Sequence, residues 1–290
     1  MLKWRRTIGL AIVVIGTLGA TLVPPAGLGR SALAYADVAE AGGAPGIPIG
    51  ASGAVGMDVS FPQCAKFNVP TVASNGAPYT FAIIGVNHGR AFTQNTCLAD
   101  EYRALNARGY ALGFVMNLNS PRNGALSQGQ QGPLGVCAMD DLPCLNYNYG
   151  WNAAQDAYSY TRQTLESIGV TDVPTSWFMD IEVTNYWSRD LTLNDQVLQG
   201  AVDFLGEATG YNMTVPSGTG ASPVVAIYSV PSQWAQIAGS SYQPAVVGWT
   251  TGARSLATAS RLCSTRLVGG ATQIVQHWNS SLNLDEDYLC

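Results

Sequence analysis

Short apolar runs alternate with longer amphipathic runs through most of the chain. Seven runs of five to seven residues are rich in β-branched and aromatic side chains, which is typical of strands buried on both faces of a parallel sheet. These predicted strands are Val55–Val59, Phe81–Val86, Ala111–Asn117, Ser176–Ile181, Val224–Tyr228, Ala245–Trp249 and Gln273–His277. Four stretches between them predict helices, namely Thr96–Arg108, Trp151–Ile168, Leu193–Thr209 and Ser232–Ala238. This alternation indicates βαβ units that build a parallel sheet.

The chain begins with a segment that we exclude from the folded domain. Three basic residues precede an uncharged apolar run over residues 8–23, and A-x-A cleavage sites follow after Ala34 and Ala36. Residues 1–36 are therefore interpreted as a signal peptide, so we expect a secreted, extracellular or cell-wall-associated protein. Arg5 and Arg6 are compatible with twin-arginine export, and an ordinary Sec signal is an equal alternative.

The length that remains suits one barrel. Removing 36 of 290 residues leaves 254, close to the roughly 250 residues of a (β/α) TIM-type barrel, although two small domains would also fit. We expect a single α/β barrel domain over residues 56–290, preceded by a flexible Gly/Ala/Pro-rich linker over residues 37–55. Seven strands are visible where a closed barrel needs eight, so one strand is irregular or the barrel is incomplete. Ser120–Tyr149 is interpreted as a long loop over one mouth.

All six cysteines lie beyond the signal segment. An even number in an exported chain favours disulfides over free thiols. Six cysteines allow fifteen connectivities. The preferred pairing is Cys64 with Cys97, Cys137 with Cys144, and Cys263 with Cys290.

Charge and composition narrow the class of ligand. Only 11% of the residues are charged and the net charge is −5, so the chain has no basic field for nucleic acid or acidic lipid. The chain has seven Trp and thirteen Tyr, whose rings suit the flat apolar faces of sugars. We expect a monomer that binds a glycan, with no nucleic acid, no membrane partner beyond the signal segment, and no cofactor.

Carboxylates follow the apolar runs at three separated places. Asp58 ends the first predicted strand, Asp180 and Glu182 end the fourth, and the acidic group 285–287 follows the last. In a barrel, the carboxyl ends of the strands line the mouth that is used for catalysis. Crowded carboxyls near apolar walls give one protonated donor and one ionised partner, which glycosidic cleavage needs. The alternative for each position alone is a helix cap or a solvated loop.

Several strings resemble family 25 glycoside hydrolases, the secreted lysozymes that act as N-acetylmuramidases on peptidoglycan. GMDVSFPQ resembles the GIDVSxxQ opening of that family, and WFMDIE resembles its D-x-E strand. FAIIGVNHGRAF, ALGFVMNLNS, AIYSVPSQW, VVGWTTG and IVQHWNSSLNLDEDYL are similar to its later strands, in the same order. The resemblance extends from about Gly56 to Cys290, which is nearly the whole mature chain.

The resemblance implies roles for individual residues. Glu182 would be the proton donor, Asp180 would position the substrate or assist the reaction, and Asp58 and Asp285 would match the opening and closing aspartates. The acetamido group of the substrate would act as the nucleophile. Departures occur at 87–89, 116–119 and 285–287, all at the mouth, so the resemblance supports the scaffold more than muramidase specificity. A glycoside-hydrolase-like domain without activity remains an alternative.

Further side chains are candidates for substrate binding. Aromatic rings and amides at strand ends could stack on sugars or bind hydroxyl and acetamido groups, or could serve packing and turn formation instead. These candidates are Tyr228, Trp234, Trp249, Trp278, Asn117, Asn119 and His88. His88 and His277 are the only histidines, and we interpret them as hydrogen-bonded mouth residues rather than metal ligands.

Two classes of function therefore stay open. In the first, the protein hydrolyses β-1,4 bonds of a cell-wall glycan through Glu182. In the second, the same mouth binds the glycan without cutting it, or the domain is a structural module of the envelope. Retention of Asp58, Asp180 and Glu182 together favours the enzyme.

Overall fold

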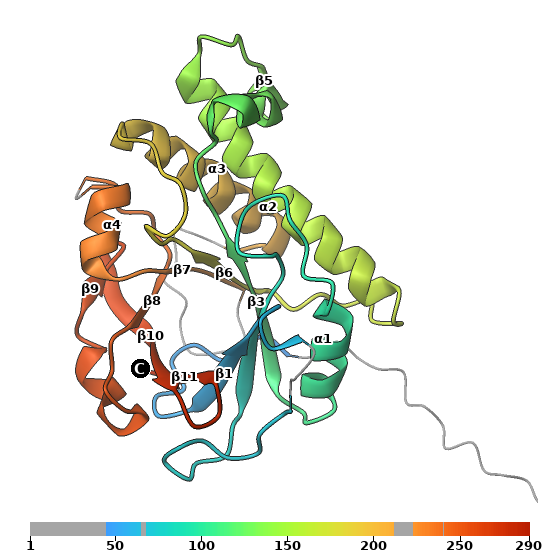
Figure 1. The fold of residues 1–290 in the computed structure, drawn as a ribbon, viewed down its shortest axis with the longest axis vertical. Helices are drawn as coiled ribbons and strands as arrows, with labels where there is room; N and C mark the ends of the chain where they lie inside the picture. The colour runs from blue at the N-terminus through green and yellow to red at the C-terminus, as the bar shows by residue number, and fades with distance from the viewer. Residues whose placement is uncertain (1–44, 65–67, 212–222, 240) are drawn as a thin grey trace, which may run out of the picture. The chain divides into compact units, whose positions relative to one another are not determined.

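The fold is a closed barrel of eight strands. The computed structural model describes residues 45–64, 68–211, 223–239 and 241–290, so the signal segment and the first part of the expected linker lie outside the described residues. Neighbouring strands follow the order β11-β1-β2-β3-β6-β7-β8-β10, and β10 pairs with β11 to close the ring (Figure 1). The strands are β1 (Val55–Val59), β2 (Phe81–Gly85), β3 (Ala111–Asn117), β6 (Ser176–Asp180), β7 (Val224–Tyr228), β8 (Val247–Thr251), β10 (Gly270–Asn279) and β11 (Leu284–Leu289). The predicted α/β barrel is confirmed.

The eighth strand is the one that the pattern missed. β11 runs antiparallel to both β1 and β10, whereas the other barrel pairings are parallel. Its sequence LDEDYL carries three consecutive acidic residues, which we interpreted as a group following the last strand. That interpretation is corrected: Glu286 and Asp287 are fully buried within the strand. Because hydrogen-bonded carboxyls replace apolar side chains here, the run lacks the hydrophobic pattern of a buried strand.

The barrel interior is filled from the amino-terminal side. Side chains at every second strand position point inward, and Phe81, Ile83 and Phe178 form part of this inner cluster. Ile47 and Ile49 precede β1, yet they are buried in the same cluster, and the Ile47 amide donates to Ser176 Oγ at 2.9 Å. The packed domain thus extends back to about residue 45. The inner layer leaves the opposite mouth free for polar groups.

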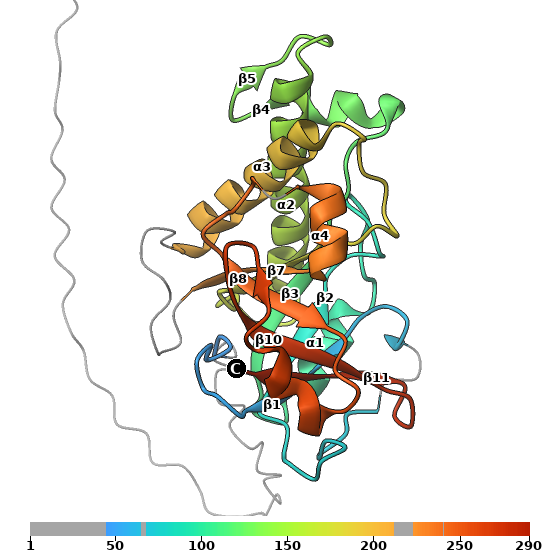
Figure 2. The ribbon, with the colours of Figure 1, turned by 90° about the vertical axis from the view of Figure 1, so that its left-hand side faces the viewer.

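The described residues form four α-helices around the barrel, and the described part of the β1–β2 connection contains none. They are α1 (Leu98–Asn106), α2 (Leu142–Glu166), α3 (Leu191–Thr209) and α4 (Pro231–Ile237), with 3-10 helices η2 (Asn123–Gly129) and η3 (Leu256–Leu262). Figures 1 and 2 show α2 running beside α3. A Cβ at Gly150 would collide with the Val197 carbonyl, and one at Gly200 with the Tyr147 carbonyl. These glycines let the two helix backbones pack closely.

The expected long loop is partly helix. Between β3 and α2 lie η2, β4 (Gln131–Gly132) and β5 (Gly135–Val136), and α2 begins at Leu142, nine residues before the prediction. Asp141 caps the helix by accepting from the Cys144 amide at 3.2 Å. The buried Asn148 donates to the Gly135 carbonyl at 3.1 Å and so ties the first turns to the hairpin. Such buried amides break the apolar period on which the prediction relied.

Three disulfides are present with the preferred pairing. They join Cys64 to Cys97, Cys137 to Cys144 and Cys263 to Cys290, and no described cysteine is free. The last one fastens the end of β11 to the segment after η3. β9 (Arg266–Leu267) adds a short antiparallel pairing to β10. Among the described helices, none has the length and apolar character needed to cross a bilayer.

Candidate active site

Strand register aligns four polar or aromatic side chains at one level of the barrel. Asn117 on β3 pairs with Asp180 on β6, Asp180 pairs with Tyr228 on β7, and Tyr228 pairs with Trp249 on β8. All four line one cavity at the carboxyl ends of the parallel strands. The Asn117 side-chain amide donates to Asp180, and Asn117 is itself held through its backbone by the side chain of Asn87. The register therefore builds one wall of the site.

The opposite wall comes from the strands that close the barrel. Asp58 on β1 pairs with Asp285 on β11, and Gln276 on β10 pairs with Asp287. Gln276 accepts from the Tyr228 hydroxyl at 2.8 Å and donates to Asp58 Oδ2 at 2.9 Å. This amide connects the aromatic wall to the first aspartate across the barrel.

One cavity of about 210 Å³ receives the predicted catalytic carboxyls. Asp58, Asp180 and Glu182 all line it, together with Asp285. Glu286 faces the other way, because side chains alternate along β11. It accepts from the Tyr79 hydroxyl at 2.7 Å and from the Asn279 amide at 3.1 Å. The structure thus brings three separated acidic segments to one place and removes Glu286 from the site.

The aspartates inside the barrel resist ionisation. Burial, followed by the charge of Asp285, raises the pKa of Asp58 to about 8. Burial and then the charges of Glu182 and Asp58 raise the pKa of Asp180 well above its usual range. Burial and then the charge of Asp58 also raise the pKa of Asp287 well above its usual range, and the two side chains share a hydrogen bond. Burial raises the pKa of Asp285 to about 6, although the nearby His277 opposes the shift. Burial and crowding therefore favour the protonated forms of these carboxyls.

Glu182 lies just beyond the end of β6, in a different environment. It is half-buried, and burial raises its pKa, while a hydrogen bond from the Gln233 side chain opposes the shift. Its backbone carbonyl accepts from Trp187 Nε1 at 2.9 Å, and Gln233 Oε1 accepts from the Val183 amide at 2.8 Å. These contacts fix the loop that carries Glu182. The result is a carboxyl that is partly desolvated yet accessible from the mouth.

The aromatic candidates separate into two groups. Trp249 is only 2% exposed, packs edge-on against Phe178 and Tyr228, and donates through Nε1 to Asp287 Oδ1 at 2.9 Å. Trp234 is also buried. Trp278 is 48% exposed and is the strand partner of Asp285. Trp278 is thus the ring that is available for stacking on a sugar at the rim, whereas Trp249 shapes the cavity wall.

Neither histidine lines the carboxyl cavity, although His277 lies near Asp285. His88 is exposed and its ring packs on Phe61, with 3.7 Å between ring centroids. The His277 Nδ1 lies 3.1 Å from the Ala253 carbonyl. Within the described ranges, no group of three or more His, Cys, Asp or Glu side chains is placed to hold a metal ion.

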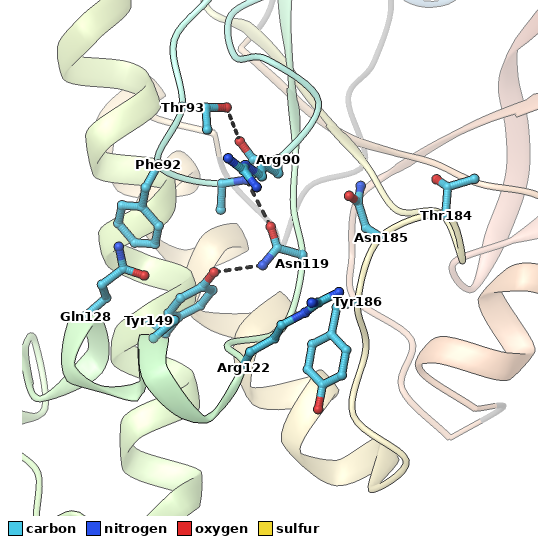
Figure 3. A pocket seen from close by; sticks show the side chains of 12 residues that line it. Arg90, Phe92, Thr93, Asn119, Arg122, Gln128, Tyr149, Thr184, Asn185 and Tyr186 are labelled. Carbon is cyan, nitrogen blue, oxygen red and sulfur yellow. Dashed lines mark hydrogen bonds between the residues drawn. The ribbon is translucent and has the colours of Figure 1, made fainter.

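Asn119 belongs to a neighbouring pocket. Two residues beyond Asn117, it donates to the Tyr149 hydroxyl at 2.8 Å and accepts from the Ala91 amide at 3.0 Å (Figure 3). That pocket has a volume of about 500 Å³ and lies beside the same mouth. Asn117 and Asn119 therefore face two different sites.

Sequence reasoning did not single out Gln276 or Gln233. Gln276 occupies an inward position in the apolar run IVQHW, where a lone amide has to find buried partners. A lone amide in an apolar run was thus the signal in the sequence that could have identified Gln276 as a site residue. Gln233 lies in α4, and its contact with the Glu182 loop depends on the fold alone.

Comparison with known proteins gives fold neighbours only. No protein-family model matches the chain, and no curated protein sequence matches it. Among solved structures, the chain is similar to a muramidase from Acremonium alcalophilum, with 14% identity, 82% of this chain and 93% of that chain covered, and a TM-score of 0.47. A family GH25 lysozyme from Aspergillus fumigatus has 13% identity, the same coverages and a TM-score of 0.48. A lysozyme from Streptomyces coelicolor has 14% identity, the same coverages and a TM-score of 0.46.

Proposed function

We propose that the protein is an exported glycoside hydrolase that cuts β-1,4 bonds of peptidoglycan in the manner of a muramidase. The observation that carries the proposal is the meeting of Glu182 with Asp58 and Asp180 in one cavity at the carboxyl ends of the strands. Glu182 is the half-buried, accessible member with a raised pKa, and this is the environment of a general acid. Asp58 and Asp180, which line the same cavity, supply the electrostatic environment of Glu182.

The proposed reaction uses Glu182 as the proton donor. Its proton passes to the glycosidic oxygen as the bond to the anomeric carbon breaks, and the carbonyl oxygen of the substrate acetamido group bonds to that carbon. Asp180, fixed by Asn117, is placed to accept a hydrogen bond from the acetamido N–H, which orients the acetamido oxygen toward the anomeric carbon. Water then attacks the anomeric carbon as the bond from that carbon to the acetamido oxygen breaks, and the water gives a proton to Glu182. The two steps together return Glu182 to its protonated form.

The dimensions of the site affect how the glycan lies. A cavity of about 210 Å³ is smaller than the 300–1,000 Å³ typical of sites that enclose a whole ligand. We infer that the glycan lies across the mouth and inserts one acetamido group, with Trp278 as a platform at the rim. The predicted signal segment and the three disulfides support an activity outside the cell, on the cell wall.

The test is peptidoglycan lysis with a matched pair of variants. Glu182→Gln removes the proton and keeps the shape, so hydrolysis should fall by a factor of about 10³ or more while the thermal midpoint stays the same. Glu207→Gln, an exposed glutamate on α3, is the control and should lyse as the wild type does. Undiminished lysis by Glu182→Gln removes Glu182 from the mechanism. Wild-type binding without lysis instead favours a glycan-binding or envelope module.

A further inference from the structure

A second pocket at the same mouth carries the opposite charge. It is lined by the loops after β2, β3 and β6 and includes Arg90 and Arg122 (Figure 3). We call it the arginine pocket, lined by Arg90, Ala91, Phe92, Thr93, Asn119, Arg122, Ala125, Gln128, Tyr149, Thr184, Asn185 and Tyr186. This set contains no Asp or Glu. Neither arginine forms an ion pair with another described residue. Two uncompensated guanidinium groups therefore share one concave surface in a protein of net charge −5.

The walls of the arginine pocket are fixed before any ligand binds. Asn119 joins the Tyr149 hydroxyl to the Ala91 amide, and Tyr149 is buried. Phe92 adopts a φ of 56°, in the left-handed region that a bulky residue seldom occupies, and its ring meets Tyr149 edge-on at 5.2 Å. Backbone strain of this kind persists only where the surroundings impose it, and it is concentrated at binding sites. The pocket is thus a built surface rather than a gap between loops.

The arginines are presented differently. The Arg122 guanidinium lies over the Tyr186 ring, 5.2 Å from its centroid, which restrains it while leaving its N–H groups free to bind. Arg90 is exposed on the opposite rim, and its backbone carbonyl accepts from the Thr93 hydroxyl at 2.6 Å. The Tyr149 hydroxyl accepts from Asn119 and can still donate. The N–H and O–H donors of these side chains suit a negatively charged acceptor.

The arginine pocket lies next to the carboxyl cavity. Asn117 lines the carboxyl cavity, and Asn119, two residues later, lines the arginine pocket. In the same way, Glu182 lines the cavity and Thr184 lines the pocket. Residues two apart in extended chain are separated by only about 7 Å. A polymer whose sugar lies over Glu182 would therefore place a substituent of that sugar in the pocket.

We propose that the arginine pocket binds a carboxylate on a short peptide branch of the glycan that lies across Glu182. This identification of the polymer rests on the proposed function, whereas the preference for a carboxylate rests on the arginines and the aromatic rings of the pocket itself. Planar guanidinium groups match carboxylates, and the Phe92 and Tyr186 rings suit small aliphatic side chains. A bare phosphate would use the arginines but leave the rings uncovered.

The experiment measures binding before turnover. The probes are Ala-Glu-Ala with a free carboxyl terminus, Ala-Gln-Ala amide as its neutral counterpart, and inorganic phosphate. The wild type should bind the acidic peptide more tightly than the neutral one and more tightly than phosphate. The double variant Arg90→Gln and Arg122→Gln should lose about tenfold in affinity for the acidic peptide. Arg108→Gln, an exposed arginine at the other end of the barrel, should retain it.

Turnover then separates this proposal from the proposed function. The wild type should hydrolyse a branched glycan with a lower KM than the same glycan stripped of peptides, and the double variant should abolish that difference. Equal affinity for the acidic and neutral peptides, tighter binding of phosphate, or an equal loss in Arg108→Gln overturns the arginine pocket. A wild type that binds the acidic peptide but lyses no cell wall overturns the hydrolase and leaves the carboxylate preference standing.

Discussion

Replacing Asp58 by Asn tests whether the cluster of buried carboxyls in the cavity lowers the stability of the protein. Folding raises the pKa of this carboxyl from 3.8 to about 8, mainly through burial. The folded state therefore binds the proton more tightly than the unfolded chain does. The stability that this provides is complete below pH 3.8 and is lost as the pH rises through 8. At pH 8, the wild type has lost nearly all of that contribution.

The magnitude follows from the shift. A rise of about four in pKa, at roughly 1.4 kcal/mol for each tenfold change in proton affinity, gives an upper bound of about 6 kcal/mol. The side chain faces the cavity and shares protons with Asp285 and Asp287, so we expect about 2–3 kcal/mol. Asn fits the same space: its oxygen can accept from Gln276, and its amide can donate to Asp287 in place of the proton that Asp58 and Asp287 share. For a domain of this size, the gain raises the thermal midpoint by roughly 5–10 °C.

The assay is thermal unfolding of wild type and Asp58→Asn from pH 4 to pH 8. The difference in thermal midpoint between the variant and the wild type should be near zero at pH 4 and should grow with pH. Hydrolysis by the variant should be lower than hydrolysis by the wild type. Asp172→Asn, which changes an exposed carboxyl before β6, should show no such growth. A variant less stable than the wild type at pH 8, or a gain independent of pH, would refute the reasoning.

The remaining predictions concern the donor and the two tryptophans. Hydrolysis should peak below pH 7, because Glu182 must be protonated to act as the donor and its raised pKa extends the pH range in which it keeps its proton. A rate that still rises above pH 8 contradicts this role. Trp249→Phe removes the hydrogen bond to buried Asp287 and should lower the free energy of unfolding in urea by about 2–3 kcal/mol, against little change for the exposed Trp278→Phe. Trp278→Ala should raise KM about fivefold with an unchanged thermal midpoint, and an unaltered KM excludes it as a sugar platform.

Much of the barrel was predictable because its strands are short and apolar on both faces. β1, β3 and β7 have the bounds that the pattern predicts, since β-branched and aromatic runs indicate buried parallel strands. Asp58 and Asp180 were predictable too, as polar residues at the ends of such runs. β11 was not, because its buried residues are carboxyls that tertiary hydrogen bonds satisfy. Ile47 and Ile49 lie in a Gly/Pro-rich stretch whose composition is typical of a linker, and only the folded barrel shows that both side chains are buried in its inner cluster.

The sequence by itself determined the order of the elements, the disulfide chemistry and the acidic residues available for catalysis, because these follow from local periodicity and residue type. Only the tertiary structure decided which of those residues face one another. Register between β3, β6, β7 and β8 sets Asn117 beside Asp180, and alternation along β11 turns Asp285 inward and Glu286 outward. The arginine pocket arises where three loops distant in sequence meet. Such contacts depend on long-range packing, and no single segment encodes them.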